Sequence, residues 1–230
     1  MFSKKNLKYQ KVPLPDNVST SDEEMLSSVT KFKEYMLKRH TIRDFSDREV
    51  SFDVLKHAIQ VAGSAPSGAN HQPWHFVAVS NAGIKSRIRE VAEIEEEKFY
   101  AGGGGDEWIK ALEPIGTNAK KPHLEIAPWL IIIFAERHGT FEDGTKYKNY
   151  YVPESVGIAT GFLIAALHKA GLSVLTHTPN PMNFLTKICN RPKSNKPVMI
   201  LTVGHASSNA TVPKVAKIKK PIDQILTLMK

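Results

Sequence analysis

The 230-residue sequence contains a single cysteine, Cys189, and no apolar run long enough to cross a bilayer. One cysteine excludes an internal disulfide and a cysteine-based metal cluster, and it is typical of a reducing compartment. A bilayer-spanning helix needs ~20 consecutive apolar residues, so the longest apolar runs, 129–135 and 161–167, indicate a buried strand and a buried helix. The N-terminus also lacks the apolar core of a signal peptide. We therefore expect a cytoplasmic protein with no membrane segment and no bound metal.

Acidic residues are outnumbered, because 23 Asp and Glu stand against 31 Lys and Arg and leave a net charge of +8. A basic protein can bind nucleic acid, a phosphorylated cofactor or an anionic substrate. Here the lysines are concentrated at 4–11 and 214–220, near the two ends, without a helix-turn-helix, zinc-finger or RNP-type motif. Solvated termini explain most of this charge, and a nucleic-acid-binding module is the least favoured interpretation.

Hydrophobic periodicity and capping signals predict an α+β chain. After an extended arm over 1–20, Ser21 and Glu24 have the spacing of a capping box, and Ser51 and Gly63 bracket a second helix. Helices are expected at about 21–39, 52–62, 84–100 and 153–170, and strands at 75–79, 127–135, 173–178 and 198–203. Since strict βαβ alternation is absent, the pattern favours α+β over a doubly wound sheet. Residues 21–230 are expected to form one domain.

Two features suggest surfaces that need a partner. The helix expected at 153–170 is rich in glycine and alanine, which lets it pack closely as a central or interface helix. The C-terminal tail after Pro213 carries an apolar patch too small to fold alone, comprising Ile222, Ile225, Leu226 and Leu228. We expect this tail to dock elsewhere, including on a second subunit.

The run R-H-T-I-R at 39–43 is the first candidate binding segment. Two arginines and a hydroxyl within five residues can hold a phosphate through bidentate and point contacts. Basic residues near a helix C-terminus are also common because they interact favourably with the helix dipole. The run alone therefore leaves both interpretations open.

The second candidate is the loop P-S-G-A-N-H-Q-P-W at 66–74, which leads into a strand. A loop this rich in turn-forming residues exposes backbone N–H groups and a serine hydroxyl, which suits a flat ring with several heteroatoms. It has neither the Walker nor the Rossmann glycine spacing. An ordinary connecting loop is the alternative.

These segments, followed by a small-residue helix and by T-H-T-P at 176–179, resemble the nitroreductase superfamily of FMN enzymes. The resemblance extends from about Tyr35 to Leu226 and points to the iodotyrosine deiodinase branch, to which A-P-S-G-A…P-W is fairly specific. It implies a nitroreductase-like fold with a mostly antiparallel central sheet flanked by helices. It also implies a domain-swapped homodimer that exchanges a C-terminal arm (about 207–230) and binds FMN non-covalently between its subunits.

The resemblance assigns the cofactor contacts to matching positions. Thr178 is the candidate catalytic residue, since its hydroxyl is expected to donate to flavin N5 and favour one-electron chemistry. Lys219 replaces a common phosphate-binding arginine, and Lys217 or Lys220 are alternatives because the spacing is lengthened here. The full FMN set is Arg39, His40, Thr41, Arg43, Pro66, Ser67, Gly68, Thr176, His177, Thr178 and Lys219.

Glu96, Tyr100 and Lys121 are the candidate substrate-binding trio. Glu96 and Tyr100 lie four residues apart and so share one helix face, although the acidic run around Glu96 also fits a solvated face. Four glycines at 102–105 follow, and because glycine resists ordering they indicate a mobile lid over about 101–120. The resemblance implies that this trio binds the ammonium and carboxylate of a free amino acid, while the backbone N–H of Ala69 binds its phenolate.

The expected activity is the FMN-dependent reductive dehalogenation of halotyrosines, releasing tyrosine and halide. The electron donor is unidentified and is either a reductase or NAD(P)H. The alternatives are an NAD(P)H-dependent nitroreductase or quinone reductase, which does not need the trio, and a flavin-fragmenting enzyme of the same superfamily. Animal deiodinases have a membrane anchor and this arm lacks one, so thyroid hormone salvage is not expected.

Overall fold

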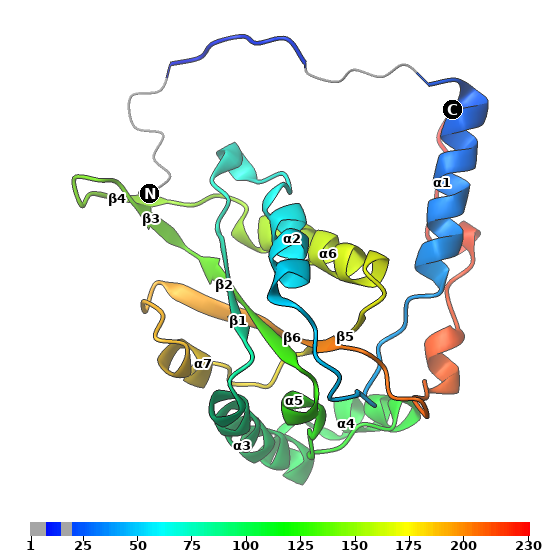
Figure 1. The fold of residues 1–230 in the computed structure, drawn as a ribbon, viewed down its shortest axis with the longest axis vertical. Coiled ribbons are helices and arrows are strands. Elements are labelled where there is room, and N and C mark those ends of the chain that lie inside the picture. The colour runs from blue at the N-terminus through cyan, green and yellow to red at the C-terminus, as the bar shows by residue number, and fades with distance from the viewer. Residues whose placement is uncertain (1–7, 15–19) are drawn as a thin grey trace.

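The centre of the molecule is a four-stranded sheet in which every neighbouring pair of strands is antiparallel. The computed structural model describes residues 8–14 and 20–230. The strand order is β1-β2-β6-β5, so β1 and β5 are the two edges (Figure 1). The strands are β1 Trp74–Val79, β2 Trp129–Glu136, β5 Ser173–His177 and β6 Asn195–Gly204. The predicted antiparallel sheet is confirmed.

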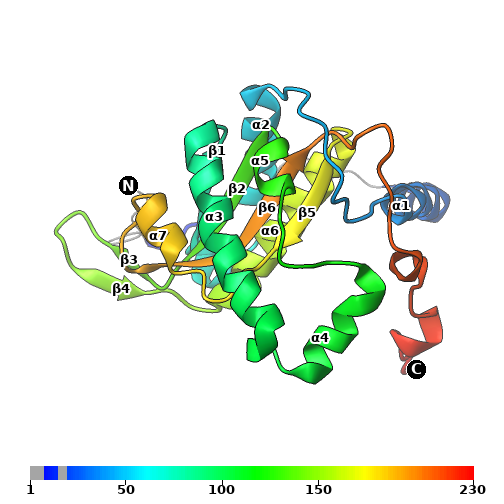
Figure 2. The same ribbon diagram turned by 90° about the horizontal axis from the view of Figure 1, so that it is seen from below.

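Helices cover both faces of this sheet. Helices α2 and α6 lie on one face, and α3, α5 and α7 lie on the other (Figures 1 and 2). Helix α1 and the C-terminal segment lie to one side, away from the sheet. The helices are α1 Asp22–Leu37, α2 Phe52–Gly63, α3 Ala82–Lys98, α4 Asp106–Leu112, α5 His123–Ile126, α6 Val152–Lys169 and α7 Phe184–Ile188.

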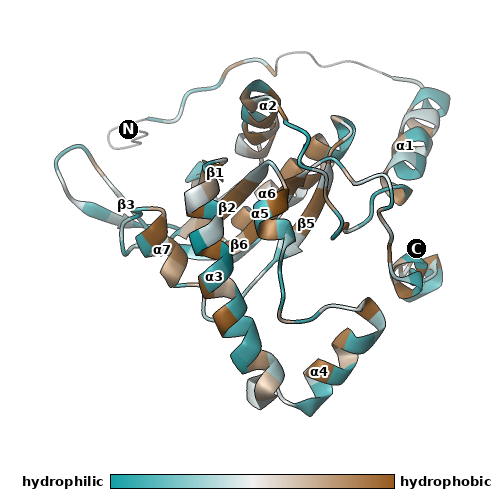
Figure 3. Cartoon of the chain, turned by 60° about the horizontal axis from the view of Figure 1, so that its bottom comes forward, coloured by the Kyte–Doolittle hydropathy of each residue, from teal (hydrophilic) through white to brown (hydrophobic). Residues whose placement is uncertain are grey.

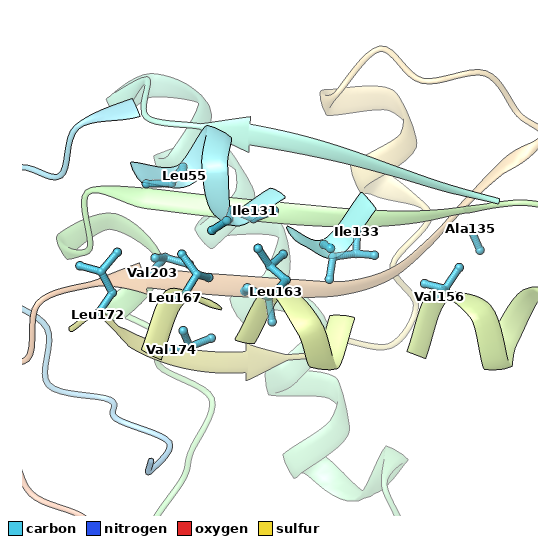
Figure 4. Close-up of a cluster of buried hydrophobic side chains, with 13 residues drawn as sticks. Leu55, Ile131, Ile133, Ala135, Val156, Leu163, Leu167, Leu172, Val174 and Val203 are labelled. Atoms are coloured by element: carbon cyan, nitrogen blue, oxygen red, sulfur yellow. The ribbon is translucent and has the colours of Figure 1, made fainter. Parts of the chain in front are cut away.

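Strand β2 organises the core because both of its faces are buried. Ile131 and Ile133 point to the α2/α6 side, where they meet Leu163 (Figure 4). Ile132 and Phe134 point to the α3/α7 side. A strand buried on both faces is continuously apolar rather than alternating, which is why the run at 129–135 was recognisable. Strand β2 and helix α6 are accordingly mostly brown, the colour of apolar residues, in Figure 3.

Local capping explains where the first helices begin. Ser21 Oγ accepts from the backbone N–H of Glu24, whose carboxylate accepts from the backbone N–H of Ser21 at 2.8 Å. Ser51 Oγ accepts from the N–H of Asp53 at 3.2 Å. Both predicted N-caps are confirmed. Each removes one backbone donor that the first helical turn would otherwise leave unsatisfied.

The four glycines lie where α3 ends and the chain turns. Helix α3 continues into a π-helical turn, Phe99–Gly103, and α4 begins at Asp106. The mobility of the 101–120 segment stays a prediction. Gly104 packs so closely on the Phe99 ring that a Cβ would lie 2.3 Å from it. Gly102 and Gly105 have positive φ angles of 116° and 73°, which glycine adopts without strain. These glycines therefore form a tight reversal between two helices.

Two other features were not anticipated. A short hairpin, β3 His138–Thr140 and β4 Lys146–Lys148, extends from the sheet. Helix α1 has no buried residue, so its apolar side chains are exposed. Of the predicted N-terminal arm, residues 8–14 lack regular secondary structure, while 1–7 and 15–19 lie outside the described residues. Within the described part of the chain, no helix is both long and apolar enough to cross a membrane.

Candidate active site

The 39–43 segment lies along the edge strand β5. Thr41 forms a parallel bridge with Val174, and the hydroxyl of Tyr35 donates to the backbone oxygen of His168, which ties the end of α1 to α6. Arg39 and His40 line a cavity of about 250 Å³. Arg43 lines the neighbouring cavity of about 220 Å³.

Both arginines offer positive charge to a ligand. Among the described residues, no salt bridge reaches Arg39 or Arg43. Burial lowers the pKa of Arg43, while Tyr100 and Asp44 act in the opposite direction. Arginine remains charged in proteins, so two unpaired guanidinium groups at one strand edge suit a phosphate.

The cavity beside Arg43 contains the predicted substrate trio. It is lined by residues of five segments: Arg43, Glu95, Glu96, Phe99, Tyr100, Trp108, Leu112, Thr117, Lys121, His123, Leu175, Thr176, His177, Thr178 and Asn180. Glu96, Tyr100 and Lys121 are therefore brought together next to the end of β5, where Thr176 and Thr178 are exposed. Segments that are far apart in the sequence thus form one pocket that contains the whole predicted substrate-binding trio.

Glu96 and Lys121 form an ion pair in this cavity. Glu96 Oε2 lies 2.9 Å from Lys121 Nζ, with the two side chains 15% and 5% exposed. The same ammonium donates to Thr117 Oγ1 at 3.2 Å and to Asn118 O at 2.5 Å. A lysine ammonium has three donors, so all three have an oxygen partner. The two charges that would hold an amino acid neutralise each other here.

The acidic run on α3 is only partly solvated, because several of its carboxylates have partners in residues 117–121. Glu93 accepts from the backbone N–H of Lys121 at 2.6 Å, and Glu97 pairs with Lys120 at 2.9 Å. Together with the Glu96–Lys121 pair, these contacts pin residues 117–121 to α3. The end of the predicted lid is thereby anchored beside Tyr100.

Tyr100 lies near both this ion pair and Arg43. Its ring lies 5.8 Å from Lys121 Nζ, a cation–π distance. Burial raises the pKa of the Tyr100 phenol, and Glu96 adds to this effect, whereas Thr117 and Arg43 oppose it. Tyr100 therefore stays protonated at neutral pH and can serve as a hydrogen-bond donor.

His123 is a site residue that the sequence did not indicate. It lies on α5, two residues after Lys121, and is 5% exposed. Its ring contacts that of His177 edge-on, with ring centroids 5.9 Å apart. The only available signal was its closeness in sequence to Lys121, which is weak because the intervening residue is a proline.

The loop that precedes β1 is held in a strained conformation. Ala69, Asn70 and Gln72 have φ angles of 51°, 51° and 52°, a region of backbone conformation that residues other than glycine rarely adopt. A Cβ on Gly68 would lie 2.7 Å from the backbone oxygen of Tyr150, so only glycine fits. Ser67 Oγ accepts from the N–H of Gln72 at 2.9 Å. Strain of this kind is often found where a ligand is bound.

This loop and the end of β5 lie at opposite edges of the sheet. Pro66, Ser67 and Gly68 precede β1, whereas 176–178 end β5. Three strand spacings separate the edges, roughly 14 Å at ~4.8 Å each. One protomer therefore splits the predicted flavin residues into two groups that it does not bring together.

Lys219 joins neither group. Its ammonium donates to Ala216 O at 2.8 Å within the exposed C-terminal segment, and it lines neither cavity at β5. Within one protomer, the predicted phosphate contact is therefore not made. Lys217 and Lys220 are likewise exposed and line neither of these cavities.

The chain belongs to the nitroreductase family, whose model matches residues 36–205. It is 49% identical to iodotyrosine deiodinase from Haliscomenobacter hydrossis over 195 residues, covering 85% of this chain and 88% of that protein. It is 41% identical to human iodotyrosine deiodinase 1 over 206 residues, covering 89% and 71%. The resemblance to the deiodinase branch is therefore confirmed.

A solved structure supports the same conclusion. A crystal structure of oxidized iodotyrosine deiodinase bound to FMN and 3-iodo-L-tyrosine superposes with a TM-score of 0.70 and 32% identity. It covers 83% of this chain, and this chain covers 94% of that one. The α+β nitroreductase-like fold is thus confirmed.

Proposed function

We propose that this protein is an FMN-dependent oxidoreductase that removes halide reductively from halotyrosines, giving tyrosine. The observation that carries this proposal is the convergence of Glu96, Tyr100 and Lys121 beside Thr178. A plain nitroreductase has no use for a buried pair of opposite charges next to its flavin. The names of the similar proteins, and the FMN and 3-iodo-L-tyrosine bound to the similar structure, support the same reaction.

The residues present fit FMN. Arg39 and Arg43 offer unpaired charge for its phosphate, with His40 and Thr41 between them. Gly68 lets the backbone of the 66–69 loop approach closely, because no Cβ fits there. The exposed hydroxyl of Thr178 is available to donate to the flavin edge, with Thr176 and the backbone at His177 beside it.

A zwitterionic substrate would exchange one ion pair for two. The Glu96 carboxylate would pass from Lys121 to the substrate ammonium, and Lys121 would take the substrate carboxylate. Tyr100 closes the pocket and donates its hydroxyl. Neither Glu96 nor Lys121 is left without an opposite charge after the exchange, so the pocket disfavours ligands that carry only one of the two charges.

The halogenated ring would lie against the flavin, with its phenolate accepting a hydrogen bond from the backbone N–H of Ala69. Bound FMN, when reduced, supplies the two electrons that break the carbon–halogen bond, while halide leaves and a proton takes its place on the ring. The protein orients the ring and excludes water. Trp108 and Leu112 of α4 line the pocket and provide an apolar cover.

The split of the flavin residues favours a homodimer. The 66–69 loop of one protomer would complete the site at β5 of its partner, so that each substrate contacts both chains. Apolar surface available for such a contact includes Phe32 on α1 (57% exposed) and Phe162 on α6 (40% exposed), which line one open hollow. Patches of this kind mark protein–protein interfaces. The exposed C-terminal segment is the arm that would be exchanged, carrying Lys219 or a neighbouring lysine to the phosphate.

A substitution in this surface tests the dimer. Phe162→Asp should yield a monomer in sedimentation velocity and lose FMN, because the site would lack its second half. Ile84→Asp is the matched control, since Ile84 is 39% exposed on α3, outside the hollow. A Phe162→Asp protein that stays dimeric and retains FMN would contradict this arrangement.

The electron donor and the cytoplasmic location stay predictions.

Substrate titration tests the function. The purified protein should be yellow, and 3-iodotyrosine should quench its flavin fluorescence to saturation. In the rival nitroreductase function, NADPH alone reduces the flavin rapidly and nitroaromatic turnover is unaffected by Glu96→Gln. That result, with no quenching by 3-iodotyrosine, would decide for the rival.

A further inference from the structure

Two buried histidines lie behind the substrate-binding charges. His123 and His177 are 5% and 7% exposed, and they come from α5 and the end of β5. Among the described residues, neither Nε2 atom has a hydrogen-bond partner. A buried polar nitrogen left unpaired is costly enough to require an explanation. No step of the proposed reaction uses either ring.

His177 faces the carboxylate oxygen of Glu96 that Lys121 does not contact. Lys121 contacts Glu96 Oε2, and the other oxygen, Oε1, lies 3.9 Å from His177 Nδ1. That separation exceeds a hydrogen bond by less than an ångström. A small rotation of the carboxylate, of the kind required when Lys121 releases it, would bring the two atoms into contact.

The surroundings keep both rings neutral. Lys121, Arg43 and Arg89 supply positive charge around His123, with Glu93 opposing them. Burial lowers the pKa of His123 to about 4 and that of His177 to about 3. A neutral imidazole has one donor and one acceptor nitrogen. Because Nδ1 of His177 faces a carboxylate, which only accepts hydrogen bonds, Nδ1 is the nitrogen expected to carry the proton.

We propose that His177 is a positioning residue for Glu96. When a substrate draws Lys121 away, the Nδ1–H of His177 donates to Oε1 and fixes the carboxylate for the incoming ammonium. His123 packs edge-on against the His177 ring and holds its plane. This role rests on the proposed function, since it concerns how the same pocket binds an amino acid.

Replacing His177 by residues that imitate one ring nitrogen tests which atom acts. Asn places an amide near Nδ1 and Gln places one near Nε2, while Leu keeps the volume without either. The readout is the ratio of Kd for 3-iodotyrosine to Kd for 2-iodophenol, which lacks the ammonium and carboxylate. His177→Leu should raise this ratio about tenfold, the loss expected for one hydrogen bond. His177→Asn should restore it to within about twofold, and His177→Gln should not.

Several outcomes would overturn the inference. Equal ratios for His177→Asn and His177→Gln, or an unchanged ratio for His177→Leu, would show that Nδ1 does not act on Glu96. If His177→Leu fails to fold or to hold FMN, the comparison of Asn with Gln decides alone. His205→Asn, a histidine outside this cavity, is the control and should leave the ratio unchanged.

A measurement without ligand separates this inference from the proposed function. In ¹⁵N spectra of the histidine-labelled, FMN-loaded protein, His177 should be the Nδ1–H tautomer and should not titrate between pH 8 and 5. The Nε2–H tautomer, or a midpoint near that of free histidine, would refute the inference. If the expected spectrum is seen but 3-iodotyrosine does not bind, the function fails while the tautomer assignment stands.

Discussion

Replacing Lys121 by Met should weaken the binding of one ligand and spare a second ligand that differs from it only in lacking a carboxylate. The ligands are 3-iodotyrosine, a zwitterion, and 3-iodotyramine, which has the ammonium alone. In the wild-type protein both must take Glu96 away from a lysine 2.9 Å distant. Only 3-iodotyrosine offers Lys121 a carboxylate in place of that of Glu96.

The magnitude follows from the burial of the pair. The Lys121 side chain is 5% exposed, and a hydrogen bond to a charged group contributes ~1.5–3 kcal/mol. Lys121→Met should therefore weaken 3-iodotyrosine binding by roughly 10- to 150-fold. It should leave 3-iodotyramine binding unchanged or tighter, because Glu96 no longer has a competing partner.

Flavin-fluorescence quenching gives both Kd values, and the chain offers a matched control. Lys120 is adjacent but its side chain is 65% exposed and pairs with Glu97 at the surface. Exposed pairs contribute ~0–1 kcal/mol, so Lys120→Met should change either Kd by less than about fivefold. An equal loss for both ligands in Lys121→Met, or the same loss in Lys120→Met, would refute the exchange of ion pairs.

Three further experiments test stability, pH dependence and thiol reactivity. Gly68→Ala should lower the free energy of unfolding by ~1–3 kcal/mol, because its Cβ would meet the Tyr150 oxygen at 2.7 Å; thermal denaturation measures this, and unchanged stability would contradict the close approach. Acid should destabilise the protein, because folding lowers the pKa of His123 to about 4 and of His177 to about 3. As the pH falls, these histidines take up protons in the unfolded chain before they do so in the folded chain. Their contribution to the free energy of unfolding is therefore complete above about pH 6.5 and is lost at lower pH, by roughly 2 kcal/mol per histidine at pH 5. Urea unfolding at pH 7.5 and 5, with His177→Leu for comparison, should show a smaller difference in the variant. Burial raises the pKa of Cys189 to about 11, so the native thiol should react with a disulfide reagent at pH 8 far more slowly than the unfolded one, and equal rates would contradict its burial.

Local sequence signals were sufficient for much of the fold. Ser21 and Glu24 form the expected capping box, and the apolar run of β2 is buried on both faces as its composition indicated. In each case, the information lies within a few residues of the feature that it determines.

Features that depend on contacts distant in sequence were not predictable in the same way. Strand order places the 66–69 loop and Thr178 at opposite edges of the sheet, and no local pattern encodes strand order. The pairing of His123 with His177 joins residues 54 positions apart. The ion pair of Glu96 with Lys121 was also not predictable, because the sequence indicates each residue as a partner for substrate and not for the other.

Release of halide by the reduced protein is the decisive test of reductive dehalogenation. FMN-loaded protein, reduced chemically with the excess reductant removed, would be mixed anaerobically with 3-iodotyrosine and quenched at successive times. The account predicts one iodide and one tyrosine per reduced flavin, with the flavin returning to its oxidised spectrum at the same rate. Flavin that stays reduced while 3-iodotyrosine is recovered intact would contradict it.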